Sequence, residues 1–185
     1  MTPPPPSRAR RALDALYAAS GALAALALAG TCVVMLAQVA GRELGILFRG
    51  ADDITAWLCA AAAFFALGHT FRQGELVRVG LVLDRLDPRR RWQAEVFSLS
   101  VAALVVAFMV YAVVRFVYES WKFNEVAQGL IKVPIWIPQL SFAIGVIIFF
   151  IAVLDELGAV LRRQKPAYQV AEEDRRARGD FSETV

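Results

Sequence analysis

The residues that most often carry out chemistry are few in this sequence and stand apart from one another. The chain has two cysteines, Cys32 and Cys59, and one histidine, His69. The cysteines form no C-x-x-C pair, which excludes the common zinc and thiol-redox motifs. A single histidine also falls short of the two axial ligands that a membrane haem needs. We therefore expect no metal, haem or other cofactor in this chain, and we interpret both cysteines as small buried apolar residues.

His69 has two possible roles. It stands near the end of an apolar stretch, where it would act either as a proton-linked switch or as a polar residue at the helix end. No phosphate-binding G-x-x-x-x-G-K-[ST], H-E-x-x-H or G-x-S-x-G pattern occurs in the sequence. The chain therefore lacks the parts of an ATPase or hydrolase, and we predict that it is not an enzyme.

Charged side chains are excluded from four long stretches, 17–40, 54–71, 96–114 and 133–154. A transporter that couples ions to substrate normally has ionisable or broken-helix sites at mid-membrane. Apart from His69, these stretches offer only neutral polar groups such as Thr31, Gln38, Thr55 and Ser141, which can be satisfied locally or across helices. The sequence thus predicts that this chain carries no ion-coupling site of its own.

The stretches are long enough to cross a bilayer, whose core of about 30 Å needs roughly 20 helical residues. Of the whole chain, 58% is hydrophobic and 20% is charged. Backbone groups in lipid must be satisfied within the segment, so the spans are helices. We predict an all-α membrane protein with spans at about 16–40, 54–71, 94–116 and 134–158. The first span is too long for a signal peptide and is expected to be retained.

The basic residues predict the orientation. Fifteen of the 20 Lys and Arg residues lie in the N-terminal tail, the loop between spans 2 and 3, and the C-terminal tail. The positive-inside rule then places both termini in the cytoplasm. The net charge of +3 is too small and too dispersed to indicate nucleic-acid binding. The expected organisation is a tail over 1–12, a membrane domain over 13–162 and a second tail over 163–185.

The loop between spans 2 and 3 has an amphipathic pattern over about 75–87. Its apolar stripe runs from Leu76 to Leu86, with Arg78 and Arg85 on one flank and acidic residues on the other. This pattern is typical of a helix in the plane of the membrane surface, or of a short helix packed on the protein's own spans. The residues that follow are expected to anchor span 3 at the membrane edge: Arg89, Arg90, Arg91 and Trp92.

Aromatic and small residues indicate how the helices meet the membrane and one another. Trp121 and Trp136 fit the outer interfacial belt, and Pro134 and Pro138 are expected in the first turns of the fourth helix. Small residues let membrane helices approach closely. They recur in span 1 at Ala18, Gly21, Ala25 and Ala29, and in span 2 at 60–63. The pattern suits either a compact bundle or a face that packs against a larger membrane protein.

Three motifs resemble those of the small membrane subunit (DctQ-like) of tripartite ATP-independent periplasmic (TRAP) transporters. They are GRE at 41–43 followed by GADDITAW at 50–57, RQGELVRV at 72–79, and KVPIWIP at 132–138. Their order and spacing within a four-span plan extend the resemblance over about residues 12–162. Asp53 replaces the family's commoner glutamate, Leu76 its histidine and Gly80 its aspartate.

The resemblance implies a division of labour within a transporter of the bacterial inner membrane. A periplasmic binding protein (DctP-like) would capture an organic acid, such as a dicarboxylate or sialic acid, and dock transiently. A large membrane subunit (DctM-like) would hold the substrate and sodium sites. The present chain would be a scaffold for that subunit in the lipid bilayer, without a cofactor.

The resemblance also suggests interface residues. Trp57, Phe64 and Phe65 would pack against the large subunit, and Arg42 and Asp53 would pair with each other or reach a partner. Arg72, Glu75 and Arg78 would fix the surface helix, while Pro134 and Trp136 would shape the outer end. Simple anchoring at the membrane edge is an equal explanation for the charged residues. Two other functions remain open at this point: a homo-oligomeric carrier or channel, and a membrane anchor for a respiratory enzyme.

Overall fold

The computed structural model describes residues 8–46, 48–73 and 87–162, without the side chains of Ala9 and Pro88. The described chain forms four long helices: α1 (Arg8–Glu43), α2 (Ala51–Gln73), α4 (Pro88–Lys122) and α5 (Trp136–Leu161). All four are long and apolar enough to cross a membrane, which confirms the predicted all-α plan with four spans. The orientation of the termini stays a prediction. The expected surface helix (75–86) and C-terminal tail (163–185) lie outside the described residues.

Two helices are much longer than a bilayer crossing requires. α1 has 36 residues and α4 has 35, so each is about 50 Å long at 1.5 Å per residue. α1 begins at Arg8, inside the stretch 1–12 that the sequence assigned to a tail. α4 begins at Pro88, where a missing N–H costs nothing because the first turn has no intrahelical acceptor. Both helices therefore carry charged turns beyond their apolar parts.

The prediction that Pro134 lies in the first turn of the fourth helix is wrong. α5 begins at Trp136, and Pro134 instead forms an isolated antiparallel bridge with Val126. The Ala127 N–H donates to the Val133 carbonyl at 2.9 Å, and the Ile135 N–H donates to the Glu125 carbonyl at 3.0 Å. The loop at 123–135 is consequently a short hairpin, here called the outer hairpin, rather than an extension of the helix. Pro138 does lie in the first turn of α5.

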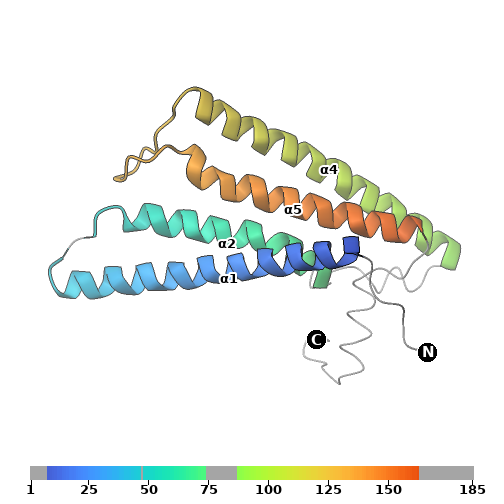
Figure 1. Ribbon diagram of the computed structural model, residues 1–185, viewed down its shortest axis with the longest axis horizontal. Coiled ribbons are helices and arrows are strands. Elements are labelled where there is room, and N and C mark those ends of the chain that lie inside the picture. Colours follow the sequence, from blue (N-terminus) through green and yellow to red (C-terminus); the bar gives the residue numbers. More distant parts are fainter. Residues whose placement is uncertain (1–7, 47, 74–86, 163–185) are drawn as a thin grey trace, which may run out of the picture.

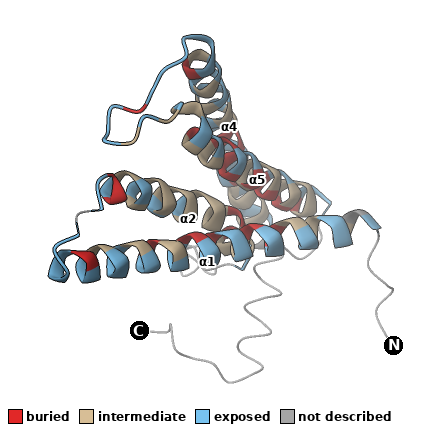
Figure 2. Cartoon of the chain, turned by 60° about the vertical axis from the view of Figure 1, so that its left-hand side comes forward, coloured by how far each residue is buried: buried red, intermediate tan, exposed pale blue. Residues whose placement is uncertain are grey.

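The helices stand in a row, in the order α1, α2, α5, α4 (Figure 1). The row consists of two helical pairs, α1–α2 and α4–α5, joined side by side through α2 and α5. At one end lie the N-termini of α1 and α4 and the C-termini of α2 and α5, and here the pairs converge. At the other end the pairs diverge (Figure 2). We call these the closed end and the open end.

The apolar core lies at the closed end, where all four helices contribute to it. Its buried members are Tyr17, Phe71, Leu99, Ala103, Ile148, Ala152, Val153 and Val160. Beyond the core each outer helix contacts one neighbour, so most of its surface is uncovered: Leu26 and Leu36 on α1 and Leu104 and Phe108 on α4 are all more than 65% exposed. In a bilayer, lipid tails solvate such side chains, so no hydrophobic force closes the open end.

α2 and α5 approach closely because glycines remove side chains from their contact. A Cβ at Gly145 would lie 2.6 Å from the Phe64 carbonyl oxygen, and one at Gly68 would lie 2.9 Å from the Ile148 side chain. The ring of Phe64 then packs on Phe142 with centroids 5.0 Å apart. This contact joins the two helical pairs in the middle of α2 and α5 and toward the closed end.

The small residues singled out on α1 lie mostly outside its contact with α2, so the alternative of a face toward a larger membrane protein stays open. Ala18, Ala25 and Ala29 are exposed, and only Gly21 of the predicted set contacts α2. The buried face of α1 consists of Tyr17, Ser20, Ala24, Ala27 and Thr31. Both faces are rich in small residues, so composition alone did not choose between them.

The interpretation of the cysteines as buried is wrong: Cys32 and Cys59 are free and exposed, because a single row of helices covers little of each helix.

Candidate partner-binding surfaces and the charge cluster

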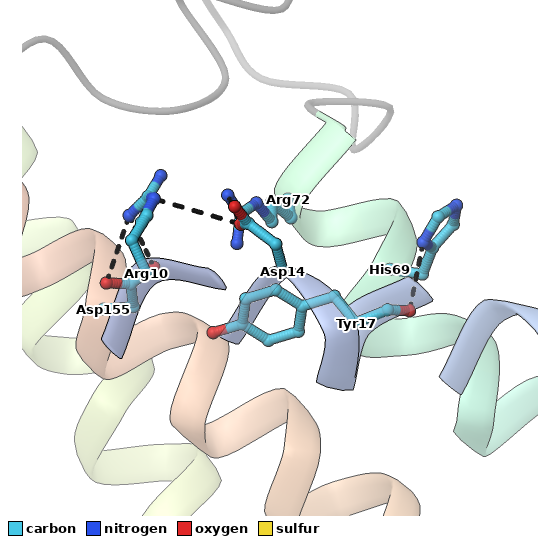
Figure 3. Close-up of polar contacts among 6 residues, drawn as sticks. All are labelled: Arg10, Asp14, Tyr17, His69, Arg72 and Asp155. Atoms are coloured by element: carbon cyan, nitrogen blue, oxygen red, sulfur yellow. Dashed lines mark hydrogen bonds and ion pairs between the residues drawn. The ribbon is translucent and has the colours of Figure 1, made fainter. Parts of the chain in front are cut away.

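Four charged side chains from three helices meet at the closed end (Figure 3). Arg10 of α1 donates to Asp155 of α5 at 3.1 Å, and its Nε lies 3.9 Å from Asp14 one turn further along α1. Arg72 of α2 pairs with the same Asp14 carboxylate. The order Asp155–Arg10–Asp14–Arg72 alternates in sign, so each charge lies beside an opposite one. We call this set the charge cluster.

Helical spacing explains why the cluster forms on α1. Residues 10, 14 and 17 are separated by four and three positions and therefore share one face. Tyr17 completes that face: its ring lies beneath the Arg72 guanidinium, with 4.8 Å from the carbon to the ring centroid. Tyr17 is 2% exposed and belongs to the core. The cluster therefore sits directly on the apolar core and fixes α1, α2 and α5 relative to one another.

The cluster is a structural contact rather than a ligand site. The space bounded by Tyr17, Phe71, Arg72, Ala152, Asp155 and Glu156 has no room for a water molecule. The Tyr17 hydroxyl is buried there without a hydrogen-bond partner among the described residues. Asp14 and Arg10 are 47% and 37% exposed, so solvent weakens their pairing to about 1 kcal/mol or less each.

His69 fastens α2 to α1 beside the cluster. Its Nδ1 lies 3.2 Å from the Tyr17 carbonyl oxygen, which only accepts, so Nδ1 donates. Nε2 then accepts from the Gln73 amide at 2.7 Å. A Cβ at Gly21 would lie 2.9 Å from the imidazole, so the glycine makes room for the ring. His69 thus joins α2 to α1 through Nδ1, while Nε2 contacts Gln73 within α2.

At the open end, Asp53 holds the outer hairpin against α2. Its carboxylate accepts the Leu130 N–H at 2.9 Å and the Ile131 N–H at 3.4 Å. Gly129 lies against the Asp53 carboxylate and Gly50 against the Ile131 side chain, where a Cβ at either position would collide. Asp53 is thus a hairpin anchor, and within the described residues it forms no ion pair with the exposed Arg42.

The chain matches the family described as the DctQ component of tripartite ATP-independent periplasmic transporters, over residues 31–163. The match covers more than half of the sequence and includes α2, α4, α5 and about the last third of α1. The chain belongs to the DctQ family. It is therefore a multi-pass membrane component of a transporter and not an enzyme, which confirms the sequence-based assignment. No curated protein matches the sequence.

The aromatic residues predicted to contact a DctQ partner lie in two environments. Phe65 packs against the chain's own core, and its carbonyl accepts from the Ser20 hydroxyl. Phe64 packs on α5. Trp57 and Trp136 are half-buried near the open end, where each keeps accessible surface. The interface role of all these residues stays a prediction.

Of the charged residues predicted to fix the surface helix, only Arg72 lies among the described residues. Arg72 pairs with Asp14 and stacks on Tyr17, which engages it within the chain. Glu75 and Arg78 lie outside the described residues. Arg42 is exposed at the end of α1, and Pro134 is exposed in the outer hairpin.

The residues predicted to anchor the membrane edges mostly face outward. Trp121 is 57% exposed at the open end and lies 6.1 Å from the Tyr118 ring, centroid to centroid. Arg89 and Arg90 are exposed at the closed end, while Arg91 pairs with Glu95 at 3.2 Å. Trp92 is half-buried and donates from Nε1 to the Val160 carbonyl at 3.1 Å. That bond joins α4 to the end of α5.

Sequence reasoning missed the charge cluster. Asp14 and Asp155 stand three and one residues outside the uncharged stretches, on the side where arginine dominates. Acidic side chains so close to the apolar part of a span are costly to desolvate unless they are paired. Their position beside the spans was therefore the available indication of an ion pair. The partners themselves depend on how the helices are rotated, which no local pattern gives. Arg10, Asp14 and Tyr17 precede the part of the chain that matches the family.

Proposed function

We propose that this chain is the scaffold subunit of a TRAP transporter that imports an organic acid across the bacterial inner membrane. A periplasmic binding protein delivers the substrate, and the large membrane subunit carries the substrate and sodium sites. The chain described here braces that large subunit and takes no part in ion coupling. Both termini face the cytoplasm, so the closed end lies at the inner surface and the open end at the periplasm.

The observation that carries this proposal is where the ionisable groups lie. No Asp, Glu, Lys or Arg occurs within the four apolar stretches, and the charged residues next to them at the closed end pair with one another. An ion-coupled carrier needs ionisable or broken-backbone sites near the membrane centre. The described spans are continuous helices whose mid-span polar groups are neutral. This favours a structural role within the transporter.

The row of helices supports a bracing role. The chain buries its core only at the closed end and leaves α1 and α4 covered on one side. A large membrane protein can pack against either uncovered face without displacing a contact inside the chain. The half-buried Trp57 and Trp136 provide aromatic contact area near the open end.

Co-purification tests the proposal. The tagged chain is solubilised from its native membrane in mild detergent, and its partners are identified and quantified by mass spectrometry. We expect one larger polytopic protein of the TRAP type in near-equal amount, and transport in liposomes only when both proteins are present with the binding protein. Isolation of the chain alone, as a homo-oligomer that moves solute by itself, would contradict the scaffold role.

The predicted interface is tested in the same preparation. Trp57→Ala and Trp136→Ala are expected to lower recovery of the large subunit, because each removes aromatic contact area. Phe97→Ala on α4 is the control: Phe97 is 72% exposed and lies near the closed end. If all three variants recover the large subunit like the parent chain, these tryptophans do not contact it.

A further inference from the structure

The arginines at the closed end fall into two groups. Arg10, Arg72 and Arg91 each pair with a carboxylate. The other five are exposed and have no carboxylate partner among residues 8–46, 48–73 and 87–162. They are Arg8 and Arg11 on α1, Arg89 and Arg90 on α4, and Arg162 at the end of α5.

The carboxylates of these pairs lie closer to the apolar spans than the five exposed arginines do. The paired carboxylates Asp14, Glu95 and Asp155 lie one to three residues outside the uncharged stretches. The five unpaired arginines lie six to nine residues outside them, which is about 9–14 Å along a helix. Charges near the hydrocarbon are paired because their desolvation is costly. The five exposed arginines have no carboxylate partner within residues 8–46, 48–73 and 87–162 and can meet another anion.

These arginines lie just beyond the headgroup layer of a bilayer, within reach of it through their side chains. That layer extends roughly 5–8 Å beyond the hydrocarbon on each side. Arginine side chains bend back toward the membrane plane while their apolar stems stay against the helix, which brings guanidinium groups from slightly further out into this layer. The α1, α4 and α5 ends that carry these residues converge at the closed end (Figure 1). The five cations therefore all lie at one end of the molecule, on three of its helices.

The open end lacks this excess of positive charge. Its described residues include five basic side chains, Arg42, Arg49, Arg115, Lys122 and Lys132, against five carboxylates, Glu43, Asp52, Asp53, Glu119 and Glu125. The closed end has eight arginines against five carboxylates, Asp14, Asp87, Glu95, Asp155 and Glu156, within the described ranges. The positive-inside rule accounts for this excess, and with both termini in the cytoplasm, as proposed above, it faces the inner leaflet of the membrane.

From this geometry we propose that the five unpaired arginines form a binding site for anionic phospholipid headgroups at the closed end. Guanidinium groups bind phosphate through paired N–H donors, and each basic residue near a charged membrane surface adds to the attraction. Exposed apolar side chains near the five arginines, such as Phe97 and Leu161, contact the acyl chains of the same lipids. The site selects phosphatidylglycerol over zwitterionic phosphatidylcholine.

Trp92 is a natural reporter for this site. It lies on α4 directly after the arginines, whereas Trp57, Trp121 and Trp136 lie near the open end. The full chain carrying Trp57→Phe, Trp121→Phe and Trp136→Phe is reconstituted in mixed liposomes of fixed phosphatidylglycerol content. Bromine is placed on either the phosphatidylglycerol or the phosphatidylcholine, and quenching of Trp92 is measured. We expect phosphatidylglycerol to be enriched about fivefold or more around Trp92.

Matched charge variants decide between a site and a general charge effect. Arg89→Gln, Arg90→Gln and Arg162→Gln together are expected to reduce the enrichment to near one. Arg42→Gln, Arg49→Gln and Lys132→Gln, which remove the same charge from the open end, are expected to leave it unchanged. Equal enrichment of both lipids in the parent chain, or equal loss in both triple variants, would overturn the proposal.

A second measurement covers the case in which the single-tryptophan chain does not fold. The chain with its native tryptophans is released from mixed micelles in the mass spectrometer, and retained phosphatidylglycerol is counted for the parent and both triple variants. Loss confined to the closed-end variant supports the site. Deleting residues 163–185 tests the competing anion, because that tail contains Glu172, Glu173 and Asp174. If phosphatidylglycerol binds only after this deletion, the tail occupies the arginines and the lipid assignment is wrong.

Discussion

The two ends of this DctQ-family chain are built on different principles. At the closed end all four helices share one apolar core, a charge cluster lies on it, and Trp92 ties α4 to α5. At the open end the helical pairs diverge, and Asp53 holds a short hairpin against α2. Because lipid solvates apolar side chains, close packing needs polar bonds or small residues to stabilise it. The closed end has both, which explains why the helices converge there.

The largest expected effect comes from Gly145, at the contact that joins the two helical pairs. Gly145→Ala places a methyl group against the Phe64 backbone, 2.6 Å from its carbonyl oxygen, and a backbone atom cannot move aside as a side chain does. We expect a loss of about 1–3 kcal/mol, typical of overpacking, seen as a lower apparent Tm in detergent.

Gly158→Ala is the matched control, because it lies on the same helix and a Cβ there meets nothing within 4 Å. It is expected to leave the Tm unchanged or to raise it slightly, since alanine favours the helix over glycine by about 1 kcal/mol. Similar destabilisation by the two substitutions would show that the loss at Gly145 does not come from the α2–α5 contact.

The open end depends on Asp53 more than on packing. Asp53→Ala leaves the Leu130 and Ile131 N–H groups without their acceptor, and hydrogen bonds to a charged group contribute about 1.5–3 kcal/mol when buried. Leu130 is exposed, so we expect a global loss below that range but markedly faster amide hydrogen exchange in the outer hairpin.

Asp52→Ala separates this effect from a simple loss of negative charge. Asp52 is exposed and accepts one bond from the Gln38 amide at 2.9 Å, so its removal is expected to leave exchange in the outer hairpin unchanged. Asp53→Asn keeps one acceptor oxygen and should lie between Asp53→Ala and the parent. If Asp52→Ala loosens the hairpin equally, the anchoring role of Asp53 is wrong.

The charge cluster gives the smallest expected effect. Asp14→Asn weakens the contacts to both Arg10 and Arg72, but Asp14 is 47% exposed and its pairs are screened by solvent. We expect a loss of about 1 kcal/mol or less, which diminishes at high salt. In a double-mutant cycle, Arg10→Gln and Asp155→Asn should be coupled, while Arg10→Gln and Asp53→Asn should be additive. Coupling between Arg10→Gln and Asp53→Asn would show that the two ends are not energetically independent.

The spans were predictable because charge exclusion over some 20 residues is a local property of the sequence. The rotation of each helix was not. Ala18, Ala25 and Ala29 form as good a small-residue face as Ala24 and Ala27, yet only the latter pack on α2. The choice depends on Tyr17, Ser20 and Thr31 sharing the second face, and on Gly21 admitting His69. Which face of α1 packs on α2 therefore depends on both helices together, and it follows only when both are placed in the structure.

The interface residues show the same limit. Asp53 stood out as an acid at the start of span 2, but its partners are backbone N–H groups of the outer hairpin, 77 and 78 residues away. Pro134 was expected inside a helix because prolines favour first turns. Its bridge to Val126 depends on a hairpin that no hydropathy pattern predicts. Sequence therefore identified which residues matter more readily than what they contact.

We propose that the chain itself holds its closed end together, whereas the large transporter subunit completes the open end. Pairs of spin labels between α1 and α4 test it directly, after Cys32 and Cys59 are replaced by serine. One pair replaces Arg11 and Gln93 at the closed end, and the other replaces Val39 and Phe116 at the open end, all exposed positions.

We predict a narrow closed-end distance distribution that is the same with and without the large subunit. The open-end distribution should be broad for the chain alone and narrow in the complex. An open-end distribution that is already narrow in the isolated chain, and unchanged by the large subunit, would contradict the account.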